Sequence, residues 1–479
     1  MAKLIWRVKL VAEFETGETT EAEVARLERD EQAGLADLGL RLAEAKQLLA
    51  AIQAQIVPAQ VAVAGERRRA CVACERELAS KGHYTATFRS LFGDVPTRVR
   101  RLLSCPCQSG GVASSSAGFD LEAATVAPEL AYVTARYAAL APFGKVADLL
   151  SELLPISGAQ NAGTVRNRTM RAGEAVVQPH AAKTAEAAAA PPAKSVVIGL
   201  DGGYVRSRHR QDERHFEVIA GKVIDAQGSQ SRFAFARNSP AIASGAFKQA
   251  LAVAGVTADT PATVLCDGDA GLWRLQREAL PNATVVLDWW HAAVRFEHAL
   301  QTARGLGAAD AHLAAEAVRG LERAKWRLWH GRWPGCRRKL AALCRWARLA
   351  KGSVRRSRME RQDEGRRTSL RGLAGIGRLE HHVGELLAYL ERNQGALVHY
   401  AARRRNGEPI STAFVESSVN EIIAKRMNKK QQMRWNRATV QPFLDVRTAV
   451  LNDTLADAFR RRYPGFRPAN DDEAVALTS

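Results

Sequence analysis

The sequence has few acidic residues for its number of basic ones, and it lacks long apolar runs. Its 479 residues include 50 Asp and Glu against 69 Lys and Arg, so the formal net charge is +19. No stretch of about 18 residues is uniformly apolar, which predicts no transmembrane helix and no membrane association. The first segment, MAKLIWRVKLVAEFE, is charged where a secretory signal is apolar, so we expect a bacterial, cytoplasmic protein associated with the nucleoid.

The excess of positive charge points to a polyanionic partner. A chain this basic repels itself unless it binds polyanions, so nucleic acid is the first partner that we expect and an acidic membrane surface the second. Charged residues make up 25% of the chain and hydrophobic ones 46%, which excludes a fully disordered or fibrous protein. The length predicts about two to four domains of roughly 100–200 residues each.

Residues 1–65 predict a strand followed by a long amphipathic helix. The strand is expected at residues 4–14, and residues 19–55 carry leucines at helical spacing with charges between them. These leucines are Leu27, Leu35, Leu38, Leu42 and Leu49. Packing within the chain and pairing with a second copy both fit this periodicity.

Two cysteine pairs follow, in a module expected over residues 66–118. The pairs are Cys71 with Cys74 and Cys105 with Cys107. Alternating residues around Gly93 predict a hairpin between the pairs. Zinc takes four tetrahedral ligands and each pair supplies two, so the pattern predicts a zinc-ribbon-like module with a structural Zn2+; four unrelated thiols are the alternative. The other cysteines are scattered and expected in the core: Cys266, Cys336 and Cys344.

Residues 119–177 predict a helical DNA-binding domain. Apolar residues at helical spacing mark three helices, with Ser157 as the expected N-cap of the third. The arrangement resembles a helix-turn-helix, and a plain helical hairpin is the alternative. The expected DNA-facing residues of the third helix are Arg166 and Arg168, with Gln160, Asn161, Thr164 and Asn167 beside them. An Ala/Pro-rich linker then occupies residues 178–194.

Residues 195–292 change to an α/β pattern. Strands are predicted at residues 195–200, 214–225, 231–236, 262–269 and 283–291, and helices at 243–254 and 271–280. Three antiparallel strands followed by parallel strands with crossover helices give the order of the RNase H-like fold, in which the strands form one mixed five-stranded sheet.

Acidic residues end two of these predicted strands. Asp201 ends the first and Asp267 the fourth, and ligands collect at the carboxyl ends of parallel strands. If the two strands are neighbours, the carboxylates need cations, and a pair of Mg2+ (or Mn2+) ions about 3.5–4 Å apart suits phosphoryl transfer. We expect a third carboxylate from Glu416, on a helix predicted at residues 411–427.

Several nearby residues are rivals or supports of this set. Asp269 rivals Asp267, because alternation along a strand points both to the same side. Glu421 rivals Glu416, but five residues turn a helix by about 500°, so the two do not share a face. Asp288 and His291 are expected beside the metal site, and a hydrogen-bonded core histidine fits His291 equally well.

The acids stand in motifs that resemble those of a known family. The motifs are DGGYV at 201–205, CDGDAG at 266–271, PNA at 281–283 before DWWH at 288–291, and FVESSVN at 414–420. They resemble the DDE transposases of bacterial insertion sequences, and residues 425–453 are similar to the tail of the ISKra-type group. The resemblance implies a DNA transposase with Asp201, Asp267 and Glu416 as its metal-binding triad, and an all-helical insertion at residues 293–408. Such an enzyme acts on double-stranded DNA, at transposon ends and target, as a homodimer or larger assembly.

Basic residues gather in the insertion and in the last part of the chain, residues 409–479. In the insertion, arginines alternate with Trp326, Trp329, Trp333 and Trp346, which we expect either in the core or stacked on an unpaired base. The later cluster consists of Lys425, Arg426, Lys429, Lys430, Arg434 and Arg437. It favours contact with the DNA backbone, and a solvated charged face is the alternative. A catalytically inactive DNA-binding regulator and a structure-selective nuclease of the same fold are the alternative functions.

Overall fold

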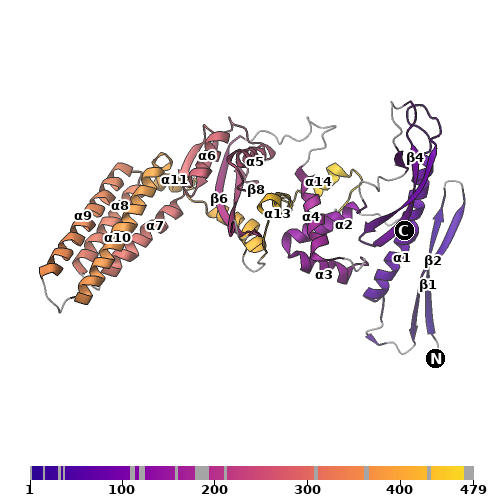
Figure 1. Cartoon of the computed structure of the whole chain (residues 1–479), viewed down its shortest axis with the longest axis horizontal. Coiled ribbons are helices and arrows are strands. Elements are labelled where there is room, and N and C mark those ends of the chain that lie inside the picture. The colour runs from indigo at the N-terminus through magenta and orange to yellow at the C-terminus, as the bar shows by residue number, and fades with distance from the viewer. Residues whose placement is uncertain are drawn as a thin grey trace. The chain divides into compact units, whose positions relative to one another are not determined.

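The structure is a computed structural model. It describes residues 3–14, 17–30, 34–35, 38–107, 114–117, 125–156, 160–177, 194–209, 213–306, 311–360, 366–428 and 433–468. The chain divides into two compact units (Figure 1). The first unit contains Met1–Ala181 together with Asp445–Ser479, and the second contains Ala182–Leu444. Of the expected last part, residues 409–479, the residues up to Leu444 lie in the second unit with the α/β core, and those from Asp445 belong to the first unit.

The first unit begins with an antiparallel hairpin of β1 (Lys3–Glu13) and β2 (Thr19–Asp30). The strand at residues 4–14 is confirmed, but the helix predicted from residue 19 is wrong over β2. Diagonal ion pairs connect the two strands, since Lys9 lies 2.5 Å from Glu21 and Arg7 lies 3.5 Å from Glu23. The helix α1 begins later and spans Leu42–Arg67.

A three-stranded sheet packs against α1. Its order is β3 (Ser80–Ser90), β4 (Gly93–Leu103) and β5 (Ser114–Ala117). The predicted hairpin is confirmed, with Ser90 paired to Gly93, whose φ of +115° suits glycine at the tight turn. The apolar contact between helix and sheet consists of Val57, Val61, Ala86, Val95 and Val99. The third strand, β5, was not predicted.

Among the helices that the structure describes, α1 alone is long and apolar enough, by length and composition, to cross a membrane. Its sequence is not uniformly apolar, because glutamines such as Gln53 and Gln55 interrupt it. In the structure Val57 and Val61 of this helix are buried against the sheet.

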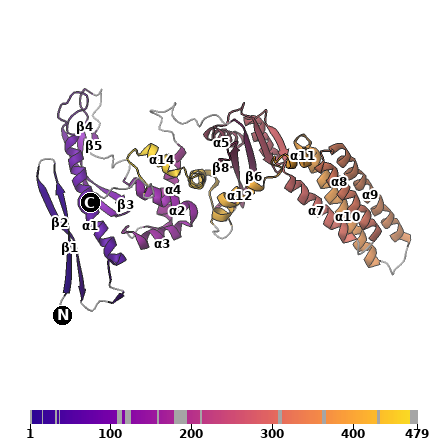
Figure 2. The same cartoon turned by 180° about the vertical axis from the view of Figure 1, so that it is seen from behind.

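Three helices complete the middle of the first unit, close to their predicted positions: α2 (Pro128–Leu140), α3 (Phe143–Leu153) and α4 (Ala162–Val177). Two of them, α2 and α4, share a core with α14 (Leu455–Arg462) and with the end of α13 (Gln441–Leu451), where Tyr132 packs on Phe459 and Phe466. Both views show α14 beside α2 and α4 (Figure 1, Figure 2). The expected N-cap Ser157 and nearly all of the expected linker lie outside the described residues.

The second unit is built on the expected mixed sheet of five strands, in the order β10-β9-β6-β7-β8. The strands are β6 (Val196–Arg206), β7 (His215–Asp225), β8 (Gln230–Ala236), β9 (Ala262–Cys266) and β10 (Thr284–Leu287). β6 is antiparallel to β7 and parallel to β9. The predicted ends were wrong in three strands: β6 continues past Asp201, β9 ends at Cys266, and β10 ends before Asp288. The crossover helices are α5 (Pro240–Val253) and α6 (Ala270–Ala279).

Four long helices follow the sheet: α7 (Trp289–Gly305), α8 (Ala311–Trp329), α9 (Trp333–Glu360) and α10 (Arg366–Arg392). Cys336 and Cys344 are buried among them, as expected. Trp329, Trp333 and Trp346 pack on the core, whereas Trp326 is 64% exposed.

The chain then returns to the sheet. It passes through the short helices η3 (Gln394–Ala396) and α11 (Tyr400–Arg405) to α12 (Ala413–Val419). A π-helix, η4 (Asn420–Asn428), continues α12 directly, and both contact β6. The short helix η5 (Arg437–Thr439) follows.

Candidate functional sites

Glycines place Asp201 under a helix. In a strand, residues two apart face the same side, so Asp201 shares its face of β6 with Gly199 and Gly203. A Cβ atom on Gly199 would lie 1.8 Å from Val415 of α12, and one on Gly203 would lie 2.7 Å from Ile423 of the π-helix. The missing side chains allow the helix to approach β6 on both sides of Asp201.

Asp201 and Asp267 come together because β6 and β9 are parallel neighbours. Gly199 pairs with Leu265, so the two acids lie at equivalent positions two residues further along. Burial raises the pKa of Asp201 to about 6; Gly202 opposes this by donating its N–H to the carboxylate at 2.8 Å, and the charge of Asp267 adds to the rise. A buried carboxylate with an acidic neighbour is a site that a cation would stabilise.

Asp269 has another role. Gly268, with φ of +93°, breaks the strand geometry, so the expected alternation of Asp267 and Asp269 does not apply. Asp269 caps α6, where its carboxylate accepts from the N–H groups of Gly271 at 2.8 Å and Leu272 at 3.1 Å. Its own N–H donates to Asp267 at 2.9 Å. Asp269 therefore supports Asp267.

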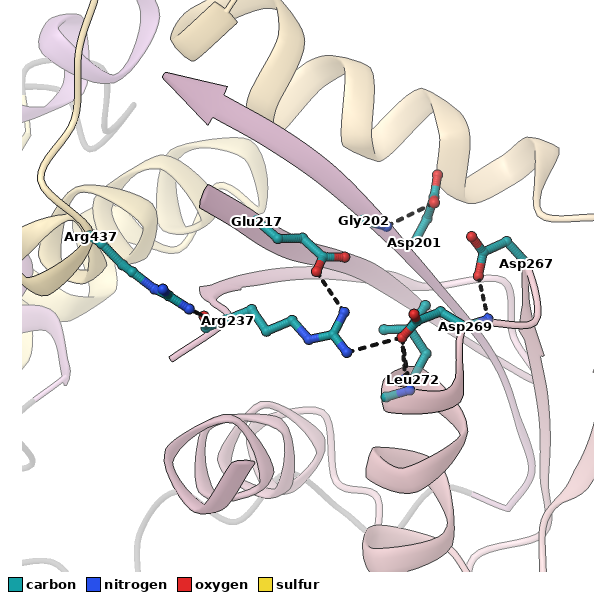
Figure 3. A network of polar contacts seen from close by, with 9 residues as sticks. Asp201, Gly202, Glu217, Arg237, Asp267, Asp269, Leu272 and Arg437 are labelled. Atoms are coloured by element: carbon teal, nitrogen blue, oxygen red, sulfur yellow. Dashed lines mark hydrogen bonds and ion pairs between the residues drawn. The ribbon is translucent and has the colours of Figure 1, made fainter. Parts of the chain in front are cut away.

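Arg237 holds this loop from the other side (Figure 3). Its guanidinium lies 2.6 Å from the carboxylate of Glu217 and 3.1 Å from that of Asp269. Glycines leave room for both partners: a Cβ on Gly202 would lie 2.3 Å from Glu217, and one on Gly271 would lie 1.8 Å from Arg237. The sequence alone did not predict a role for Arg237, because only the Asp-Gly pairs at 201–202 and 267–268 indicated a site in this part of the chain.

Asp288 joins two helices. Its side chain is buried and accepts from the N–H of Trp290 at 2.6 Å, which caps α7. The hydroxyl of Thr412 donates to its other oxygen, and His291 Nε2 lies 3.7 Å away. Thr412 immediately precedes α12, so Asp288 fixes the start of the helix that carries Glu416.

Glu416 lies on α12 next to Val415, which packs on β6, but its side chain is exposed. The structure brings Asp201 and Asp267 together and places Glu416 on the helix over the same strand. It does not gather the three carboxylates, because within the described ranges only the four cysteines form a group of three or more possible metal ligands within 4.8 Å. The rival Glu421 pairs at 3.1 Å with Arg232 of β8.

The cysteine group is compact. Cys71 Sγ lies 3.5 Å from Cys107 Sγ, and Cys74 Sγ lies 3.4 Å from Cys105 Sγ. The backbone N–H groups of Ala73 and Cys74 lower the pKa of Cys71 to about 7, which favours the thiolate. Four sulfur atoms at these distances, with N–H donors directed at one of them, can hold a metal such as zinc.

Some of the expected DNA-binding residues are used inside the protein. Arg426 is fully buried and lies over the ring of Phe443 at 4.9 Å, and Arg437 pairs with Glu213 at 3.1 Å. The expectation of a basic cluster without acidic partners was therefore wrong at Arg437. Lys425 and Arg434 are exposed, and Lys429 and Lys430 lie outside the described residues.

The two arginines of α4 that we expected to face DNA make contacts within the protein. Arg166 is half-buried and donates to Asn167 at 3.2 Å. Arg168 is 7% exposed, and it donates to Gln160 at 3.1 Å and Thr134 at 3.4 Å. Its side chain points into the helical core, not out from an open helix face.

A scan of the chain against models of known protein families finds no match. A search of curated proteins finds no match either. The functional argument therefore rests on the residues and on their geometry.

Proposed function

We propose that the protein is a DNA transposase whose second unit is an RNase H-like catalytic core with a helical insertion after β10. The supporting observation is the parallel pair β6 and β9, which brings Asp201 and Asp267 to the same end of the sheet. The strand order and the later helix α12 over β6 agree with this fold. The charge of +19 agrees with a DNA partner.

In this proposal Asp201 and Asp267 hold Mg2+ or Mn2+ through their oxygens, and Glu416 supplies a third carboxylate. Two such ions would activate the attacking oxygen and stabilise the leaving oxygen of a phosphodiester. Because the pKa of Asp201 is raised to about 6, its carboxyl group retains a proton mainly below pH 6, and cation binding in that range would release it. Glu416 would have to turn towards Asp201, and its exposed position on α12 leaves that side chain room to move.

The first unit would bind DNA. The four cysteines hold one structural Zn2+ in a ribbon-like module, and the helices α2 to α4 lie beside it in the chain. Transposition handles two DNA ends together, so we propose a homodimer or a larger assembly in the bacterial cytoplasm.

The test is cleavage and joining of a labelled DNA end by the full chain with Mg2+. Asp201→Asn and Asp267→Asn should abolish both steps and retain DNA binding. Asp259→Asn, in an exposed turn, is the matched control and should act like the wild-type chain. Equal activity of Asp201→Asn and the wild-type chain refutes the assignment, and cleavage without joining indicates a nuclease.

A DNA-binding protein without chemistry is the second candidate. It is favoured by the separation of Glu416 from the two aspartates. The same assay decides, because this candidate binds DNA but gives no product with either metal ion.

A further inference from the structure

The first unit contains a cavity of about 380 Å³ that the catalytic proposal does not use. It lies among α2, α4 and α14, beside the residue Arg89 of β3. Its described lining residues include four arginines and no acidic residue; the arginines are Arg89, Arg168, Arg171 and Arg462. The volume falls in the usual range of small-molecule sites, roughly 300–1,000 Å³.

The buried arginine of this cavity, Arg168, has uncharged hydrogen-bond partners. Arg168 is only 7% exposed. Its guanidinium donates hydrogen bonds to the uncharged side-chain oxygens of Gln160 and Thr134. Burial lowers its pKa; Asp94 opposes the fall, and the charges of Arg89 and Arg171 add to it. Asp94 also serves Arg89, at 3.9 Å. Of these three guanidinium groups only that of Arg168 is buried, because Arg171 is exposed and the side chain of Arg89 is 41% exposed. An anion in the cavity would neutralise the buried charge of Arg168 and could also contact the more exposed arginines beside it.

Another part of the cavity's lining, which we call the apolar wall, consists of apolar side chains. It is formed by Phe459 of α14 and by small side chains such as Ala172 and Ala175 of α4. Thr164 and Asn167 add hydrogen-bonding groups on the same helix as Arg171. A ligand that fits has an anionic end and a largely apolar, planar or ring-shaped body.

We propose that this cavity binds one nucleotide of a DNA strand, with its phosphate against the arginines and its sugar and base along the apolar wall. Guanidinium groups bind phosphate oxygens in pairs, and aromatic side chains pack against bases. The proposal rests on the DNA-binding part of the proposed function and not on the catalytic acids. A free nucleotide carries the same phosphate, and the experiment separates the two sources.

The first experiment measures binding of the full chain to a labelled DNA duplex with a single-stranded overhang, by fluorescence anisotropy over a range of salt concentrations. Arg171→Gln and Arg462→Gln should each weaken binding about 10-fold and reduce the salt slope by about one. Arg461→Gln is the matched control, because Arg461 precedes Arg462 on α14, is exposed and does not line the cavity. Equal losses for Arg461→Gln and Arg462→Gln would show that only net charge matters, and would overturn the proposal.

The second experiment replaces single phosphates of the overhang with neutral methylphosphonates. One replacement should weaken binding by the wild-type chain and have no effect on binding by Arg462→Gln, because the contact is already lost. Inorganic phosphate and a mononucleotide are tested as competitors and as thermal stabilisers. A mononucleotide that stabilises the wild-type chain but not Arg462→Gln, with DNA binding equal in both, assigns the cavity to a free nucleotide and overturns the DNA source. Loss of cleavage in Asp201→Asn is scored separately, so the two proposals fail independently.

Discussion

Replacing Arg237 with glutamine tests how the Asp267 loop is held. Arg237 does not touch Asp267; it binds Asp269, whose N–H donates to the Asp267 carboxylate at 2.9 Å. Glutamine is smaller, has no charge, and cannot reach Glu217 and Asp269 with the same pair of donors. The substitution therefore releases Asp269 and leaves the carboxylate of Glu217, which is 15% exposed, without its cation.

The size of the effect follows from these contacts. Hydrogen bonds to charged groups contribute about 1.5–3 kcal/mol each when buried. Arg237 is 29% exposed and Asp269 is 40% exposed, so water replaces part of the lost interaction. We expect the free energy of unfolding to fall by about 2 kcal/mol. Small displacements of a catalytic group reduce rates by up to roughly 100-fold, so we expect cleavage to slow about 10- to 100-fold at limiting Mg2+.

The assay is the cleavage rate as a function of Mg2+ concentration, with urea unfolding in parallel. Arg237→Gln should require more Mg2+ for half-maximal rate and recover partly at high Mg2+. Arg274→Gln is the control, because Arg274 lies on the helix that Asp269 caps and makes only a 3.9 Å pair with Glu278. If Arg237→Gln loses stability but keeps the wild-type Mg2+ dependence, Arg237 does not position Asp267 and the reasoning is refuted.

Three further predictions concern the zinc site, Asp201 and the glycines of β6. The purified chain should contain one Zn2+, and Cys71→Ser with Cys74→Ser should remove it; elemental analysis that finds no zinc in the wild-type chain contradicts the site. In EDTA, Asp201 binds its proton more tightly in the folded state, because its pKa rises from 3.8 to about 6. The wild-type chain should therefore lose stability relative to Asp201→Asn as pH rises from about 4 to 7, by roughly 3 kcal/mol in urea unfolding, and a constant difference contradicts this. Gly199→Ala should destabilise the chain by about 1–3 kcal/mol, because the new Cβ meets Val415 at 1.8 Å, whereas Gly245→Ala, with open space around it, should not; equal unfolding midpoints for both would disprove the close approach of α12.

The sheet of the second unit was predictable, because its buried strands are short apolar runs that turn residues separate. The strand β2 was not. The spacing of its leucines also fits a helix. Glu21 and Glu23 form ion pairs with Lys9 and Arg7 of β1, and these pairs cannot be foreseen until the two segments are known to lie side by side. The pattern of apolar and charged residues in one segment does not show which other segment will pair with it.

The candidate site was predictable where function depends on strand order, and less so where it depends on loops. The proximity of Asp201 and Asp267 follows from parallel neighbours. The capping role of Asp269 follows from the positive φ of Gly268, which the sequence does not specify. The burial of Arg426 was not predicted, because the rings that it contacts, Trp435 and Phe443, belong to later segments whose packing the sequence does not specify.

The shared core of the first unit has a consequence for synthesis. Arg447 donates to the carbonyl of Ala139, 308 residues earlier, and Phe459 packs on Tyr132. On the ribosome, the second unit emerges complete before the emergence of α14, which packs on the helices α2 and α4. A chain released before residue 445 would lack Arg447 and Phe459, so the helices α2 and α4 could not complete this core.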